Sequence, residues 1–126
     1  MPIDTQIDRA KQLTIFKVKG AVSVSEAQKA LISFYEGHPT QNTLWDCREG
    51  SLENFWEGAV ADSARLSLSL ASRFRQARPQ GKTAAVTPSD LDFGIASQYV
   101  AYAGLSPYEF RVFRQMAQAL QWLSGA

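Results

Sequence analysis

The chain has 126 residues, with 13 Lys and Arg against 12 Asp and Glu and a formal net charge of +1. This balance gives no electrostatic argument for binding nucleic acid, an acidic membrane surface or an acidic substrate. One cysteine excludes an internal disulfide, and no apolar run approaches the roughly 20 residues that span a bilayer.

The length predicts a single domain, 1–126, that buries one core. The N-terminal residues have neither the apolar segment nor the cleavage site of a signal peptide. Together with the lone cysteine, this predicts a cytoplasmic protein.

The first part of the chain predicts a β-hairpin, a helix and a short strand. Residues 5–8 and 13–19 are rich in β-branched or apolar side chains and are separated by a polar stretch, which is typical of a hairpin. Ser23 and Glu26 have the spacing of a capping box, which opens a helix. A short buried strand is expected at 43–46.

Residues 59–79 fit two patterns, because Leu66, Leu68 and Leu70 alternate with serines as in a half-buried strand. A helix is favoured, since the flanking Ala, Arg and Gln are good helix formers. Small and apolar residues also form one helical face over about five turns. They are Ala59, Ser63, Leu66, Leu70, Phe74 and Ala77.

A strand is expected at 82–86, followed by a helix with a strong start signal. Thr87 is predicted to cap that helix, with Pro88 at its first position and Asp90 near the free N–H groups. The helix should run to about Gly104.

The chain should end with a strand at 108–113 and a helix at 114–123 that turns Met116, Leu120 and Leu123 inward. The order of elements is therefore ββαβαβαβα. It predicts an α/β fold with a mixed sheet of about five strands and about four helices packed around it. The last three strands are each reached through a helical crossover, which favours parallel pairing.

In such a sheet, the strand ends at Asp46, Thr87 and residues 113–114 should open on one edge, which we call the carboxyl edge. Ligands tend to bind outside the carboxyl ends of parallel strands. A ligand site is therefore expected at the carboxyl edge.

Cys47 follows the expected strand 43–46, and we asked whether it is a nucleophile. A catalytic cysteine needs a base or a positive environment, and the only histidine is His38. His38 precedes that strand, so the two side chains should lie on the order of 15 Å apart. We therefore expect Cys47 to be a small buried residue. No catalytic residue, metal site or cofactor is predicted.

Two further patterns were weighed for anion binding. The "GKT" at 81–83 imitates the end of a phosphate-binding loop, but it leads into a strand, whereas that motif opens a helix. The other pattern is a basic cluster, which fits either cations near a helix C-terminus or an anion or phospholipid contact. Its members are Arg65, Arg73, Arg75, Arg78 and Lys82.

Three segments carry a resemblance to a known family: "LWDCREG" at 44–50, "GKTAAVTPSDLDFGIASQYVAYAG" at 81–104 and "YEFRVFRQMAQALQWL" at 108–123. The chain resembles the small bacterial SpoIIAA-like proteins, which are related to STAS and Sec14-type (CRAL-TRIO) domains. The resemblance covers about residues 5–123 and is densest after residue 81. It implies a mixed sheet with helices around it and a binding or regulatory module with no established reaction.

STAS anti-sigma-factor antagonists are switched by phosphorylation of a serine in the loop after the third strand. The corresponding loop here makes Ser51 the candidate for phosphorylation. The sequence departs from the family at this point, because Gly50 precedes Ser51 and the Asp-Ser-x-Gly-like context is missing. Ser51 can equally be a helix cap or a loop residue, and a phosphate at a helix start would be tolerated.

The resemblance to Sec14-type lipid carriers implies an apolar cavity, which a chain of this length can form only as a small pocket. We expect this pocket at the carboxyl edge. Its predicted ligand-binding residues are Asp46, Cys47, Arg48, Thr87, Ser89, Asp90, Phe93 and Arg114.

The function predicted is a non-catalytic module that binds another protein or a small ligand. The alternative is a carrier of a lipid or another apolar or amphipathic ligand. A third possibility is an enzyme subunit whose site a partner chain completes. A homodimer could form where "YEFRVF" or the N-terminal hairpin lies at a sheet edge. No nucleic-acid partner is predicted.

Overall fold

A computed structural model describes residues 3–37, 39–79, 81–103 and 108–125. It confirms the predicted α/β order, with five strands and four helices in the described part of the chain. The elements are β1 (Ile3–Asp8), β2 (Leu13–Ala21), α1 (Val24–Glu36), β3 (Asn42–Ser51), α2 (Glu57–Arg73), the 3-10 helix η1 (Arg75–Ala77), β4 (Lys82–Val86), α3 (Asp90–Tyr102), β5 (Glu109–Phe113) and α4 (Met116–Ser124).

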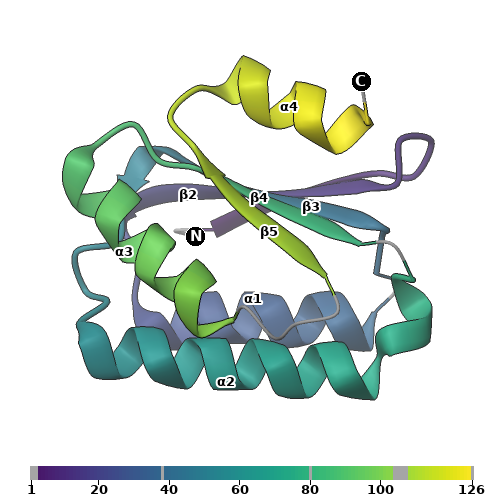
Figure 1. Ribbon diagram of the computed structural model, residues 1–126, viewed down its shortest axis with the longest axis horizontal. Helices are drawn as coiled ribbons and strands as arrows, with labels where there is room; N and C mark the ends of the chain where they lie inside the picture. The colour runs from purple at the N-terminus through teal and green to yellow at the C-terminus, as the bar shows by residue number, and fades with distance from the viewer. Residues whose placement is uncertain (1–2, 38, 80, 104–107, 126) are drawn as a thin grey trace.

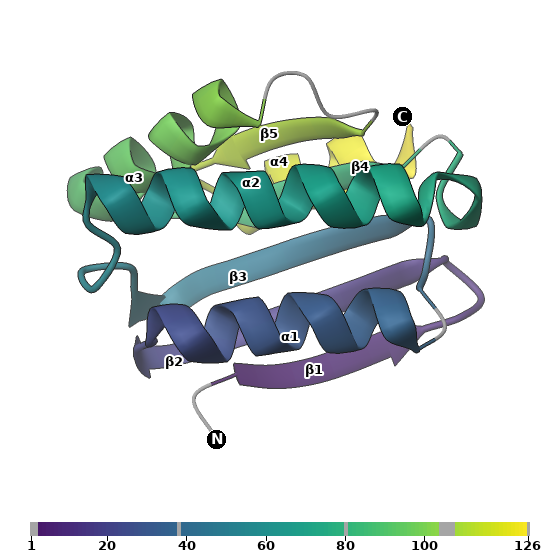
Figure 2. The same ribbon diagram turned by 90° about the horizontal axis from the view of Figure 1, so that it is seen from below.

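The strands form one mixed sheet in the order β1-β2-β3-β4-β5. β1 pairs antiparallel with β2, and the other three pairings are parallel, as predicted. Because each crossover joins neighbouring strands in the same direction with the same hand, α1, α2 and α3 all lie on one face. Figure 1 shows these three helices below the sheet and α4 above it, and Figure 2 shows the same helix layer in front of the sheet.

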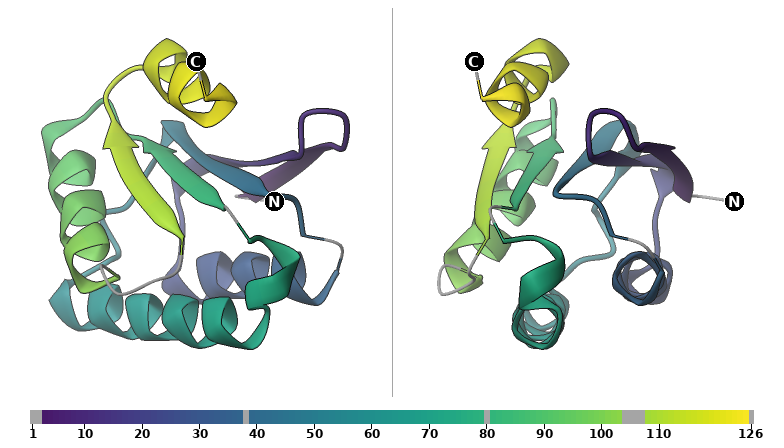
Figure 3. Two further views of the ribbon diagram at one scale, coloured as in Figure 1. Left: turned by 45° about the vertical axis from the view of Figure 1, so that its right-hand side comes forward. Right: turned by 90° about the vertical axis from the view of Figure 1, so that its right-hand side faces the viewer.

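The sheet therefore carries α1, α2 and α3 on one face and α4, over β3 to β5, on the other, which Figure 3 shows from the side. Successive strand residues point to opposite faces, and the core divides accordingly. Under α4 it contains Leu13, Leu44, Ala84, Val86, Ala119 and Leu123. On the α1 to α3 side it contains Phe16, Phe34, Tyr35, Leu70, Ala71 and Tyr108, with a smaller cluster of Val18, Val22 and Cys47.

Two local predictions are confirmed, the helix through "LSLSL" and the capping box of α1. The "LSLSL" stretch is helical within α2, which buries Ala59, Ser63 and Leu70, while Ala77 lies beyond the helix and is exposed. At the start of α1, the Ser23 hydroxyl accepts from the Glu26 N–H (3.1 Å) and donates to its carboxylate (2.8 Å). Within the described ranges, no helix is both long and apolar enough to cross a bilayer.

Several predicted boundaries were wrong. α2 ends at Arg73, short of the predicted Ala77. β3 runs to Ser51, so Cys47 lies inside this strand and does not follow it. α3 is capped by Ser89, whose hydroxyl accepts from the Asp92 N–H at 3.1 Å. Thr87 does not cap α3, because α3 begins only at Asp90, and Thr87 still pairs along the sheet, where its N–H donates to the carbonyl of Phe113 (2.8 Å). Pro88 was predicted at the first helical position, but it precedes the cap residue.

In α4, Leu120 was predicted to point inward, but its side chain is 41% exposed. Ala119 takes the inward position and is fully buried, because α4 lies close to the sheet there. Leu123 is buried and Met116 is partly buried against the same core cluster, as predicted.

Candidate functional site

A cavity of about 130 Å³ lies between the sheet and the layer of α1, α2 and α3. Its floor consists of alternate strand residues that share one face of the sheet: Val18, Thr43, Trp45, Cys47, Thr83, Ala85 and Phe110. The helices contribute mainly Leu31 and Tyr35 from α1, Val60, Ser63 and Ser67 from α2, and Ile95, Ala96 and Tyr99 from α3.

The two ends of the cavity differ in chemistry. Near the carboxyl ends of the strands, the lining is apolar and includes Val22, Leu52 and Phe55 beside Cys47. The other end lies where β3 and β4 begin, and there the lining is polar. Thr43 and Thr83 are register partners at that end, about 13 Å from Cys47 along β3. Tyr35, Arg78 and Tyr108 complete the polar end.

Arg78 lies in the connection between η1 and β4 and is only 2% exposed. Its Nε donates to the carbonyl of Gln41 (3.0 Å), and its Nη1 donates to the Tyr35 hydroxyl (2.9 Å). Its Nη2 donates to the carbonyl of Lys82 (3.1 Å) and to Thr83 Oγ1 (3.3 Å). These bonds tie the starts of β3 and β4 to the end of α1.

The Arg78 guanidinium also lies over aromatic rings, with its central carbon 4.5 Å from the ring centre of Tyr108, 5.3 Å from that of Phe34 and 5.8 Å from that of Tyr35. Ring faces attract cations, which stabilises the charge in this position. Among the described residues, however, Arg78 takes part in none of the ion pairs. Buried charges are usually paired with an opposite charge, so this arrangement is unusual.

The burial of Arg78 does not follow from the sequence pattern, in which it belongs to a basic cluster near a helix C-terminus. Arg65, Arg73 and Arg75 of that cluster are exposed. Arg78 differs because the chain turns back toward the sheet after η1 and carries this side chain beneath the starts of β3 and β4. No local pattern around residue 78 signals this burial.

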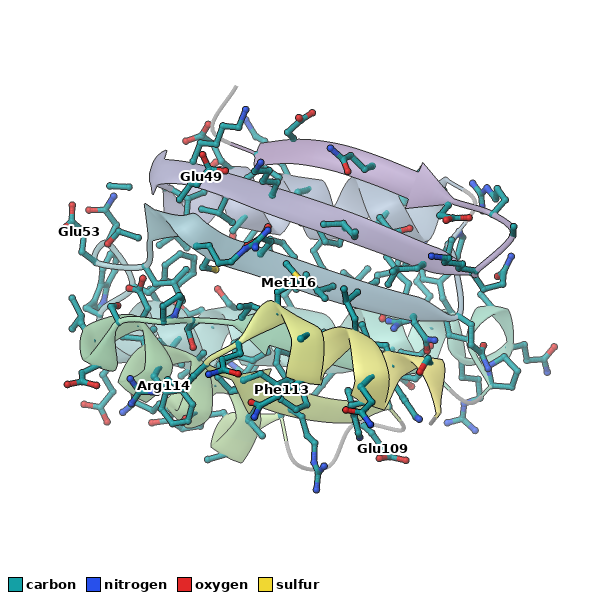
Figure 4. The ribbon with its side chains drawn as sticks, turned by 90° about the horizontal axis from the view of Figure 1, so that it is seen from above. Glu49, Glu53, Glu109, Phe113, Arg114 and Met116 are labelled. Atoms are coloured by element: carbon teal, nitrogen blue, oxygen red, sulfur yellow. The ribbon has the colours of Figure 1, made fainter. Side chains whose placement is uncertain are left out.

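At the carboxyl edge, part of the predicted ligand set comes together. Arg114 Nη1 donates to Asp90 Oδ1 (2.7 Å) and to the carbonyl of Pro88 (3.1 Å), and its guanidinium lies 4.2 Å from the ring centre of Phe93. Ser89 caps the same helix end. Figure 4 places Arg114 toward the same end of the molecule as Glu49 and Glu53. The Arg114 guanidinium and the Asp90 carboxylate thus form hydrogen bonds within the chain.

Asp46 and Arg48 form a separate pair. Asp46 is 3% exposed and accepts from Arg48 Nε (2.9 Å) and Nη2 (3.0 Å). Although burial opposes ionisation, the hydrogen bonds from Arg48 hold the pKa of Asp46 below its ordinary value. Asp46 and Cys47 are consecutive strand residues, so they point to opposite faces and only Cys47 lines the cavity.

Ser51 and Thr87 are set into the backbone network near the strand ends. Ser51 Oγ accepts from the Glu53 N–H at 3.1 Å, and α2 begins only at Glu57, so Ser51 is the last residue of β3 and not a helix cap. The hydroxyl of Thr87 is buried and has no hydrogen-bond partner among the residues described.

Cys47 is 3% exposed. Burial first, and then the charges of Asp92 and Asp46, raise the pKa of its thiol to about 12. At neutral pH the thiol is therefore protonated and a poor nucleophile. The predicted separation from His38 concerns a residue outside the described ranges.

We expect Cys47 in the folded protein to react with 5,5′-dithiobis(2-nitrobenzoate) at pH 7.5 at least about 100-fold more slowly than in the unfolded chain. The reagent has little access to the buried sulfur, and only a small fraction of the thiol is ionised at this pH. The release of the coloured thiolate, followed with and without guanidinium chloride, measures this ratio. Equal rates would contradict the burial of the thiol.

No protein-family model matches this chain. No curated protein matches it either. In the described ranges, no group of three or more His, Cys, Asp or Glu is placed to hold a metal ion. The candidate site is a cavity between the sheet and the helices that is apolar at one end and carries a cation at the other.

Proposed function

We propose that the chain is a non-catalytic binding module, of the SpoIIAA-like type that its motifs resemble, which holds a small apolar ligand between the sheet and α1 to α3. The observation that carries this proposal is the cavity of about 130 Å³ with its largely apolar lining. An engineered protein cavity of about 150 Å³ binds benzene, so a single ring or a short alkyl chain is the size that fits. A complete phospholipid is too large.

The chemistry of the lining supports binding more than catalysis. Cys47 is the one thiol of the chain, and its raised pKa argues against a nucleophilic role. The phenols of Tyr99 and Tyr108 have their pKa values raised to about 12, mainly by burial, so they stay neutral at physiological pH. Such groups orient a ligand through hydrogen bonds without exchanging protons with it.

The strand order supports a ligand site between the sheet and the helices, and not at the carboxyl edge. Ligands bind at the carboxyl edge of an open sheet where the strand order reverses and two helices diverge. The order β1-β2-β3-β4-β5 contains no reversal, and the three crossover helices lie side by side on one face. The space in this fold lies between those helices and the sheet.

Binding of toluene to the unaltered chain tests this proposal, and the Ala96→Leu variant tests whether the toluene lies in the cavity. Ala96 lines the cavity from α3 and is 6% exposed, so a leucine there would fill part of the space. We expect toluene to raise the melting temperature of the unaltered chain but not that of Ala96→Leu, as measured by calorimetry. The variant itself should be more stable by about 0.5–2 kcal/mol, as cavity-filling changes commonly are.

Ala101→Leu is the matched control, because Ala101 is exposed on the same helix. It should keep the response to toluene. The proposal fails if toluene leaves the unaltered chain unchanged, or if Ala96→Leu responds as strongly as Ala101→Leu does.

A further inference from the structure

Arg78 is the only charged side chain among the described residues that line the cavity. Its guanidinium hydrogen bonds go to the carbonyls of Gln41 and Lys82 and to hydroxyl groups, all of which are neutral acceptors. Nη1 bonds one acceptor, the Tyr35 hydroxyl, although it carries two hydrogens. The cavity therefore ends in a positive charge that no described acidic side chain neutralises.

The groups beside Arg78 add to this donor-rich character. Thr43 Oγ1 donates to Thr83 Oγ1 (2.8 Å), and both hydroxyls lie within 3.5 Å of Arg78 Nη2. No Asp or Glu occurs among the described lining residues. A concave apolar space that ends in a guanidinium and hydroxyl groups is complementary to a molecule with an apolar body and an anionic head.

The aromatic rings around Arg78 explain why the charge is tolerated but do not neutralise it. Ring quadrupoles attract a cation, whereas a buried charge is fully compensated only by an opposite charge with good geometry. The remaining Nη1 hydrogen can donate to one oxygen of a carboxylate, and such a charge-assisted hydrogen bond is stronger than one to a neutral acceptor. A purely structural role for Arg78, tying the strand starts together, gives no reason for the cavity to distinguish ligands by charge.

We propose that the cavity selects a small organic acid, with a single ring or a short alkyl chain, whose carboxylate pairs with Arg78 and whose apolar part lies along Trp45 toward Cys47. This inference rests on the proposed binding function and names the ligand class. The volume of about 130 Å³ limits the acid to a body near the size of benzene.

Three probes of nearly equal shape test the charge preference on the unaltered chain: benzoate, toluene and benzylamine. Isothermal titration calorimetry at pH 7 measures each Kd. We expect benzoate to bind at least ten-fold more tightly than toluene, and benzylamine to bind at least ten-fold more weakly than toluene. Ala96→Leu should weaken benzoate binding by at least ten-fold, whereas Ala101→Leu should leave it unchanged.

Arg78→Gln provides the second arm, with folding checked by circular dichroism. In the folded variant, toluene should bind as before, and benzoate should bind more weakly than toluene. If this variant does not fold, the three probes on the unaltered chain still decide the question.

The outcomes separate the two proposals. If toluene binds in the cavity but benzoate binds no better, the acid preference is wrong and the binding function stands. If none of the probes binds, both are wrong. If benzoate binding is the same in Ala96→Leu, benzoate occupies another place and the inference is overturned.

Discussion

Replacing Arg78 with alanine is expected to lower the free energy of unfolding by about 3–5 kcal/mol. The change removes the Arg78 donor from the carbonyls of Gln41 and Lys82 and from the Tyr35 hydroxyl. It also opens a void where the guanidinium packs against the Tyr108 ring. Removing the buried charge recovers some desolvation energy, but each lost bond to a charged group costs about 1.5–3 kcal/mol, so the net effect is destabilising.

Urea unfolding followed by circular dichroism measures this effect. Arg75→Ala is the control, since Arg75 belongs to η1 nearby and is exposed, and its replacement should change the stability by no more than about 0.5 kcal/mol. Arg78→Lys keeps the charge but not the planar fork of donors, so it should recover only part of the loss. Equal stabilities for Arg78→Ala and Arg75→Ala would show that the buried network contributes nothing.

Phe16→Ala is expected to cost about 3–5 kcal/mol, as is usual for a buried phenylalanine. Phe16 is 1% exposed, stacks on Trp45 with ring centres 4.3 Å apart, and meets the edge of Phe34 at 5.8 Å. The variant loses the burial of a large ring and two aromatic contacts, and it frees Trp45, which lines the cavity. Guanidinium chloride unfolding gives the change in stability.

Leu91→Ala is a suitable comparison for Phe16→Ala, because the Leu91 side chain is 59% exposed on α3. Its replacement should alter stability by no more than about 0.5 kcal/mol. If Phe16→Ala cost no more than Leu91→Ala, the aromatic cluster under α1 would not be part of the stable core.

At the carboxyl edge, where a ligand site is expected, several of the predicted residues pair with one another. Arg114 pairs with Asp90 and covers Phe93, and Asp46 pairs with Arg48. The sequence indicated correctly that the strand ends meet there, because parallel strands end on one side. It did not indicate that these residues would satisfy one another, since that depends on side-chain directions across three loops.

The sequence by itself determined the order and type of the elements. Hydrophobic periodicity and capping residues act over a few neighbours, which is why the helix through "LSLSL" and the capped start of α1 could be predicted. Only the tertiary structure decided the boundary of β3, the outward turn of Leu120, the burial of Arg78 and the cavity itself. Each depends on which segments, far apart in the chain, come to lie together. Arg78 is buried because two strands and the end of α1 surround its loop, and no neighbour in sequence encodes that.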